Sequence, residues 1–271
     1  MKHIPLRCIP AALLAAALLA GCGAKTAASA RPAGSRELKS TPPDSMHATA
    51  AITEQYTLEK VVQAENGGTV RLNIHLPRLE SDSADAARIN AEITRYYEND
   101  VLDYADSPAA ADPAVWDFSI EMNWEASWYD DCVSLVVSSC YGGTDAPFYD
   151  GWCFDFATGK QVFVAEMLQR MGLDPDETQL AVYRAAIQTF DRNMVQWEYY
   201  DSLRESGMLS GMRADTLRDN GLENLTVLLK NENTVTLVAG YHTTAGSGWR
   251  PLEVELPLTP AAVSYTHLTL P

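Results

Sequence analysis

Residues 118–125 read Phe-Ser-Ile-Glu-Met-Asn-Trp-Glu, and this stretch decides the fold. From Phe118 to Trp124 every second side chain is apolar, and the positions between carry serine, glutamate or asparagine. Because successive side chains of a strand point to opposite faces, this alternation predicts a strand with one buried face. Residues 133–137 continue the same period, which predicts a second strand directly after the first.

Further strands are expected on both sides of this pair. Residues 70–76 alternate in the same way and end at Pro77, and Leu252 to Leu256 alternate with two glutamates. Alternation of this kind is typical of an antiparallel sheet that buries one face. The remaining expected strands cover residues 56–63, 152–156, 227–229 and 234–239.

Two stretches have the helical period instead. A shorter helix should begin at Asp82 or Ser83. A longer helix should begin at Asp174, because an N-cap aspartate, a proline and two acidic residues follow one another there. We expect it to run to Ser206 and Gly207, with one apolar stripe made of Leu180, Tyr183, Ile187, Phe190, Met194 and Trp197.

These elements predict an α+β fold. In this fold, one face of an antiparallel sheet is covered by the long amphipathic helix and by the shorter one. A single domain over residues 52–262 would contain all of them.

The start of the chain has the features of an export signal. Lys2 and Arg7 precede a short apolar run that is too short to span a bilayer and ends in Leu19-Ala20-Gly21-Cys22. This ending resembles the lipobox of bacterial lipoproteins. We expect residues 1–21 to be a signal peptide and Cys22 to carry the lipid that anchors the protein to the cell membrane, outside the cytoplasm. The alternative is a plain secretory signal.

Two further segments lie outside the expected fold. Residues 22–51 are rich in Ala, Ser, Thr, Pro and Gly, and we interpret them as a flexible tether that holds the domain roughly 30 Å from the bilayer. Residues 263–271 can be encoded by a sequence that resembles a transposon-end sequencing adapter. We interpret them as an artefact, with the true gene continuing beyond Ala262; the alternative is a short C-terminal strand.

Charge and motif content narrow the function classes. The net charge is −16, which is the wrong sign for a nucleic-acid-binding protein and favours a cationic partner. Among the five histidines, no two have metal-ligand spacing. The sequence contains no nucleophile elbow, phosphate loop or dinucleotide fingerprint. We therefore expect no cofactor, no metal and no catalytic activity.

Three cysteines lie in the predicted domain. Cys140 and Cys153 flank a glycine-rich stretch and would face each other across a symmetric hairpin, which would allow a disulfide bond. Alternatively, all three thiols are reduced and half-buried in the sheet. Cys132 has no partner in either arrangement.

A group of aromatic and acidic residues is the candidate ligand surface. Trp128, Tyr129, Asp130 and Asp131 should lie at a strand end, and we place the turn 141–145 at the same end of the sheet. Exposed aromatic rings there could stack on sugars or anchor a protein partner. The alternative is that Trp124 belongs to the core and that Asp130 and Asp131 are ordinary turn residues. The turn consists of Tyr141, Gly142, Gly143, Thr144 and Asp145.

Several of these segments, in this order, resemble one known domain. It is shared by lysozyme-sensing anti-sigma factors of the RsiV type and by the non-catalytic N-terminal region of PdaC-type peptidoglycan deacetylases. The family usually has Ala-His after the double glycine, whereas Thr144-Asp145 stands here, so no role of that histidine is carried over. The matching segments are residues 70–79, 89–93, 134–141, Gly142-Gly143, 154–160 and 241–256.

The resemblance implies an extracytoplasmic binding domain without catalysis. We expect a lipid-anchored binding or sensing domain at the bacterial cell envelope, whose ligand is a cationic protein such as lysozyme or a cell-wall glycan such as peptidoglycan. Two alternatives stay open. One is an envelope hydrolase that acts on cell-wall sugars through paired carboxylates, and the other is an accessory domain of a larger, truncated protein.

Overall fold

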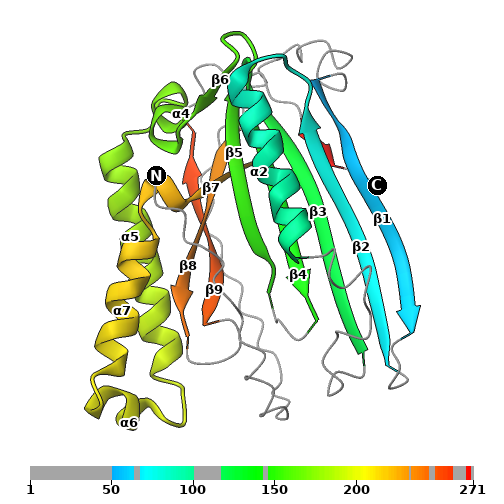
Figure 1. The fold of residues 1–271 in the computed structure, drawn as a ribbon. Helices are drawn as coiled ribbons and strands as arrows, with labels where there is room; N and C mark the ends of the chain where they lie inside the picture. The colour runs from blue at the N-terminus through cyan, green and yellow to red at the C-terminus, as the bar shows by residue number, and fades with distance from the viewer. Residues whose placement is uncertain are drawn as a thin grey trace.

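The computed structural model describes residues 51–63, 68–100, 117–142, 146–231, 233–243, 248–258 and 267–269. The predicted signal peptide, Cys22, most of the tether and the segment Gly143–Asp145 lie outside these residues. The described chain forms two β-sheets with helices beside them (Figure 1). The prediction of a mixed helix and strand fold with a mostly antiparallel sheet is therefore confirmed.

The larger sheet, which we call sheet A, has the strand order β1-β2-β3-β4-β5-β6. The pairs are antiparallel except for β2 and β3, which run parallel. A short strand, β10 (His267–Thr269), pairs antiparallel with β3 within the segment that we interpret as an artefact. The strands of sheet A are β1 (Ile52–Gln63), β2 (Thr69–Leu79), β3 (Asp117–Tyr129), β4 (Cys132–Tyr141), β5 (Phe148–Asp155) and β6 (Lys160–Val162).

The parallel pair follows from the helix between its two strands. Parallel neighbours need a long crossover connection, and here it contains α2 (Ala84–Asp100). The helix begins as the sequence predicts, because the hydroxyl of Ser83 accepts a hydrogen bond from the amide of Ala86 at 3.1 Å. Ile89 and Ile93 of α2 are buried against the apolar side chains of β2, β3 and β4.

The smaller sheet, sheet B, is antiparallel and has the order β7-β8-β9. Its strands are β7 (Thr226–Asn231), β8 (Thr234–His242) and β9 (Trp249–Pro257). The other helical segments are α4 (Val164–Arg170), α5 (Pro175–Met194), α6 (Tyr200–Glu205), α7 (Met208–Asp219) and the short 3-10 helix Leu222–Asn224. Within the described ranges, no helix is long and apolar enough to cross a membrane.

The two sheets correct the expected arrangement of helices. The prediction placed the long and the shorter helix on one face of a single sheet. In the structure α2 lies on sheet A, whereas α5 and α7 lie beside sheet B (Figure 1). The alternating strand pattern could not reveal this division, because a strand shows the same period in either sheet.

The predicted long helix is also divided. Asp174 is the N-cap, as predicted, and its carboxylate accepts hydrogen bonds from the amides of Asp176 and Glu177. However, α5 ends at Met194, and α6 and α7 follow as separate helices. The buried stripe of α5 consists of Thr178, Val182, Ala186, Phe190 and Met194.

The buried stripe of α5 is rotated from the predicted one. Only Phe190 and Met194 belong to both stripes, and Leu180 is 51% exposed. Small side chains at Thr178 and Ala186 line the buried face. A pattern search that follows large apolar residues therefore selects the exposed side of α5 in its first two turns instead of the buried side.

Strand β7 joins the two sheets. The Ser134 hydroxyl of β4 donates to the carbonyl oxygen of Val227, and the Ser127 hydroxyl of β3 accepts from the amide of Leu229 at 3.3 Å. Gly151 of β5 lies against Thr226 of β7 with no room for a side chain, since a Cβ there would lie 2.6 Å from the methyl carbon of Thr226. Sheet A is thus covered by α2 on one face and by β7 on the other, and β4 is buried on both faces.

Candidate functional site

An open pocket of about 270 Å³ lies beside the turn between β3 and β4. The turn is formed by Asp130 and Asp131, and Asp130 has a φ of 51°, in the left-handed region that aspartate tolerates better than most residues. The pocket is lined by Tyr129, Asp130, Asp131, Cys132, Asp155, Ala157 and Arg170.

An ion pair forms one wall of this pocket. The guanidinium of Arg170, in the last turn of α4, donates to Asp155 Oδ2 at 2.8 Å and to Glu166 Oε1 at 2.7 Å. A third contact joins Arg170 Nη1 to the sulfur of Cys132 at 2.7 Å. The two carboxylates compensate the guanidinium, so that Arg170 adds no uncompensated positive charge to the pocket.

Asp155 is a buried anchor rather than a reactive group. Its other oxygen accepts hydrogen bonds from the amides of Ala157 and Thr158 at 2.9 and 3.1 Å, which fixes the turn before β6. Burial opposes ionisation of Asp155, but the hydrogen bonds from Arg170 and the Thr158 amide outweigh it and hold the pKa below its ordinary value. The carboxylate therefore stays ionised at neutral pH.

The other two buried groups of the pocket stay protonated at neutral pH. Burial raises the pKa of Cys132 to about 11, although Arg170 acts in the opposite direction. Burial, helped by the charge of Asp130, also raises the pKa of Tyr129, whose hydroxyl donates to the backbone oxygen of Arg170 at 2.9 Å. A thiol with this pKa is a weak nucleophile, because only the thiolate reacts.

The rim of the pocket differs from its walls. Asp130 and Asp131 are exposed, and neither carboxylate makes a hydrogen bond or an ion pair with any described residue. Two unpaired carboxylates beside a concave surface suit a cationic group of a ligand. The pocket can therefore accept an ammonium or guanidinium group at its rim without breaking an existing ion pair.

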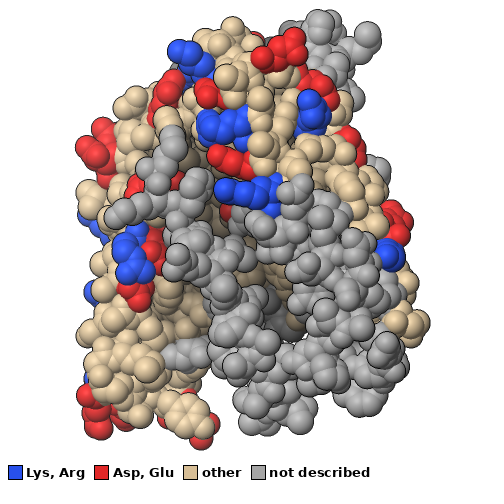
Figure 2. Space-filling model, in the orientation of Figure 1, with Lys and Arg blue, Asp and Glu red and all other residues tan. Residues whose placement is uncertain are grey.

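The overall acidic charge does not by itself mark this site. On the face shown in Figure 2, Lys and Arg side chains are interspersed with Asp and Glu side chains rather than separated from them. Partly exposed ion pairs, such as those of Arg88 with Asp85 and Glu92, also bring opposite charges together on the protein surface. A cationic ligand would therefore need a local feature such as the Asp130–Asp131 rim.

The predicted ligand surface is only partly brought together. Trp128 is buried on the α2 side of sheet A and stacks on Phe156 with ring centroids 5.2 Å apart, whereas Tyr129 lies on the opposite face. Because neighbouring residues of a strand point to opposite faces, the two rings cannot contact one ligand together. Trp128 is therefore a core residue and not part of a ligand surface.

The second half of that surface is at the wrong end of the sheet. Tyr141 is the last residue of β4 and Gly142 follows it, whereas Asp130 and Asp131 precede the first residue of that strand. At about 3.4 Å per residue, the strand separates them by about 30 Å. The prediction was wrong because it placed both turns beside each other, although a hairpin strand has its two turns at opposite ends.

The predicted disulfide between Cys140 and Cys153 is not present. Cys153 lies opposite Ser134, and Cys140 lies opposite Glu121 on β3. The register of β4 and β5 is set by their apolar face, where Leu135 pairs with Trp152. A symmetric hairpin with the two cysteines opposite each other would break this pairing.

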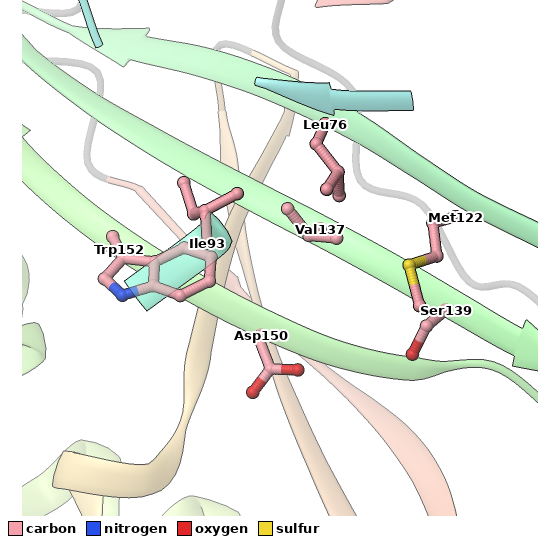
Figure 3. A pocket seen from close by; sticks show the side chains of 7 residues that line it. All are labelled: Leu76, Ile93, Met122, Val137, Ser139, Asp150 and Trp152. Atoms are coloured by element: carbon pink, nitrogen blue, oxygen red, sulfur yellow. The ribbon is translucent and has the colours of Figure 1, made fainter. Parts of the chain in front are cut away.

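A second, smaller cavity lies between α2 and sheet A (Figure 3). Its volume is about 10 Å³, which is close to the minimum for one water molecule. Ser139 and Asp150 lie at one side of it, and the other lining side chains are apolar. We interpret this cavity as a packing defect of the core and not as a ligand site.

Sequence reasoning missed Asp155 and Arg170. The Asp155-Phe156-Ala157-Thr158-Gly159 segment did carry a signal, because an aspartate before a glycine turn often binds the backbone amides that follow it. For Arg170 no signal was available, since it is one arginine in a short helix. The described part of the chain contains no cluster of three or more side chains that could hold a metal ion.

Comparison with known proteins does not assign this chain to a family. A scan against family models finds no match, and a search of the curated proteins finds none either. The resemblance to the RsiV-type domain therefore rests on the short segments quoted above and enters below as part of a proposal.

Proposed function

We propose that this protein is a lipid-anchored, extracytoplasmic binding or sensing domain of the bacterial cell envelope, and that its ligand is a cationic protein. The observation that carries the proposal is the pair of unpaired carboxylates, Asp130 and Asp131, at the rim of the pocket. The acidic composition and the resemblance to lysozyme-sensing domains support the same ligand class, and lysozyme is the first candidate.

The pocket favours a basic protein over a neutral glycan. Its lining carries the carboxylates of Asp130, Asp131 and Asp155 against one guanidinium, so its net charge is negative. A lysine or arginine side chain of the ligand could place its charge at the rim and its aliphatic stem along Ala157. A neutral sugar would gain much less from the two rim charges, although the ring of Tyr129 could contribute a stacking surface if the pocket opened.

Titration calorimetry with lysozyme at about 0.15 M salt tests the ligand. We expect the double variant Asp130→Asn/Asp131→Asn to bind at least about tenfold more weakly, because each lost charge pair contributes on the order of 1 kcal/mol. Binding by the unchanged protein should weaken further at 1 M salt, where the Debye length falls from about 10 Å at 0.1 M to about 3 Å.

The control for this experiment removes the same charge elsewhere. Glu198 and Glu205 are exposed acidic residues at the far end of the α5–α7 layer, so Glu198→Gln/Glu205→Gln tests the effect of net charge alone. An equal loss of affinity in both double variants would contradict a local site. Equal heats with lysozyme and with a basic protein of similar charge would contradict a specific ligand.

Lipid attachment is tested separately in cells. We expect Cys22→Ala to leave an unprocessed precursor that takes up no labelled fatty acid, because the thiol of Cys22 is the proposed acceptor. The unchanged protein, labelled in parallel, should incorporate the fatty acid and appear in the membrane fraction. Label that persists on the Cys22→Ala variant would contradict the anchor.

A further inference from the structure

Strands β2 and β3 pair along only part of their length. The parallel pairing joins residues 69–74 of β2 to residues 117–122 of β3 and ends there. Strand β3 continues to Tyr129, and on its other side it stays paired with β4 over this whole stretch. The side of β3 that β2 leaves is therefore a sheet edge within sheet A, and this edge runs up to the Asp130–Asp131 turn.

The facing side of β2 is blocked against strand pairing. The amide of Glu80 donates to the carbonyl oxygen of Ala51 at 2.8 Å, so the backbone groups of Leu79 point away from β1 and towards the gap. The side chain of Asn90 on α2 accepts a hydrogen bond from the Leu79 amide at 2.9 Å and donates one to the Leu79 carbonyl oxygen at 3.0 Å. Two positions earlier, Pro77 has no amide hydrogen to donate. Of the two strands that border the gap, β3 is thus the one suited to accept another strand.

One short strand lies in this gap. Strand β10 pairs antiparallel with β3, with Leu268 opposite Ala126 and its two neighbours opposite Glu125 and Ser127. We interpret residues 263–271 as an artefact, so β10 shows that the edge accepts a strand but is not its natural occupant.

We propose that residues 125–129 of β3 form a strand-acceptor site, and that its natural occupant is an extended segment of the cationic protein ligand, which adds to sheet A antiparallel to β3. A strand that adds to a sheet edge gains affinity from main-chain hydrogen bonds and specificity from its alternate side chains. The class of ligand rests on the proposed function, whereas the acceptor edge follows from the strand pairing alone.

The pairing defines the side chains that such a segment needs. Residues directly opposite each other on antiparallel strands share one face of the sheet. Ala126 has a small side chain and lies in the core that sheet A forms with α2, so the residue opposite it should be apolar. The residue opposite Glu125 belongs to the other face, where a polar side chain suits the carboxylate.

The antiparallel direction brings the N-terminal end of the added strand to the rim of the pocket. Asp130 and Asp131 lie four and five positions after Ala126, so the residues at the same distance before the apolar residue of the segment lie beside them. Neighbouring strands are about 4.8 Å apart, a distance that an extended lysine or arginine side chain spans. The segment should therefore carry a basic residue four or five positions before its apolar residue.

Fluorescence anisotropy with a labelled peptide, Val-Ser-Tyr-Thr-His-Leu-Thr-Leu-Pro, tests the acceptor edge. The peptide has the sequence of residues 263–271, and the full chain carries Leu268→Pro/Thr269→Pro to displace β10. Consecutive amides of a strand point to opposite sides, so one of the two prolines removes an amide that faces β3. We expect this variant to bind the peptide at least about tenfold more tightly than the unchanged chain, whose own strand competes at high effective concentration.

The matched control is Leu268→Val/Thr269→Val, which keeps both amides and should bind the peptide as weakly as the unchanged chain. Hydrogen exchange followed by mass spectrometry should show protection of residues 125–129 when the peptide binds the proline variant. Circular dichroism checks that the proline variant keeps the Tm of the control. Equal peptide affinities in the two variants, or protection confined to another part of the chain, would overturn the proposal.

A second peptide tests the connection to the rim. It carries Val263→Lys and Ser264→Lys, the two positions that the register places beside Asp131 and Asp130. We expect it to bind the proline variant about tenfold more tightly than the first peptide, because two charge pairs are gained. Adding Asp130→Asn/Asp131→Asn to the proline variant should remove this gain, and a gain that persists would contradict the antiparallel direction.

Lysozyme separates this inference from the proposed function. If the ligand supplies the added strand, the proline variant should bind lysozyme several-fold more tightly than the valine control, because β10 no longer competes for the edge. Lysozyme binding that depends on Asp130 and Asp131 but is equal in these two variants would leave the proposed function intact and overturn the strand-acceptor site.

Discussion

The variant Asp155→Ala is expected to lower the free energy of unfolding by about 3 kcal/mol or more. The Asp155 side chain is 6% exposed, and its removal leaves Arg170 without its most buried partner. It also removes the acceptor for the Ala157 and Thr158 amides, which would lose their hydrogen bonds in the turn before β6. Urea unfolding at pH 7 measures the loss.

Two further variants separate the contributions to this effect. Asp155→Asn keeps an acceptor for the two amides but removes the charge, so it should cost less than Asp155→Ala. Glu166→Gln removes a partner of the same guanidinium that is 49% exposed, and its cost should stay below about 1 kcal/mol. Equal losses for Glu166→Gln and Asp155→Ala would contradict the role of Asp155 as the buried anchor.

The same residue gives a pH dependence. The pKa of Asp155 is lower in the folded domain than in the unfolded chain, so its contribution is complete above the unfolded pKa of about 4. This contribution is lost as the pH falls from there through the folded pKa. The stability difference between the unchanged protein and Asp155→Asn should therefore shrink below about pH 4, and a difference that grows in acid would contradict the assigned direction.

The variant Phe190→Ala is expected to cost about 3–5 kcal/mol, the range for truncating a fully buried phenylalanine. Phe190 is 1% exposed and packs with Met194 and Met212, which joins α5 to α7. Removal of the ring leaves a cavity between the two helices. The free energy from urea unfolding, with an unchanged slope of the transition, measures the loss.

The matched control lies on the same helix. Leu180 is 51% exposed, so Leu180→Ala should change stability by less than about 0.5 kcal/mol. This comparison also separates the two interpretations of α5, because the apolar stripe predicted from the sequence includes Leu180. A loss of 2 kcal/mol or more in Leu180→Ala would support the predicted stripe and contradict the observed one.

The sequence predicts the helices and strands of this fold better than it predicts which of them pack against each other. The strands around Val70, Ile120 and Val254 and the N-cap at Asp174 are local features, and the structure contains them. The division into two sheets depends on contacts between residues such as Ser134 and Val227, which are 93 positions apart. No local period contains that information.

The candidate site is predictable to a similar extent. Asp130 and Asp131 were expected in a turn, and they form the rim of the pocket. One of its walls comes from β5 and α4, and the bond between Arg170 and Asp155 requires these two elements to converge. The error over Trp128 has a different cause, because an aromatic residue beside a turn is typical of both a binding surface and a core.

The contact between the two sheets has a consequence for the folding of the newly made chain. The segments of sheet A paired through β6 end at Val162, whereas sheet B begins only at Thr226. A chain that emerges from its N-terminus can therefore pair β1 to β6 while sheet B is still unmade. Until β7 is made, the hydroxyls of Ser127 and Ser134 lack their hydrogen bonds to the backbone of Leu229 and Val227. The surface of sheet A around Gly151 is then not covered by Thr226. Strand β7 is an edge strand of sheet B, so the backbone groups on its outer side have no partner within that sheet. The hydrogen bonds to Ser127 and Ser134 cover part of this edge, which could otherwise pair with a strand of a neighbouring chain.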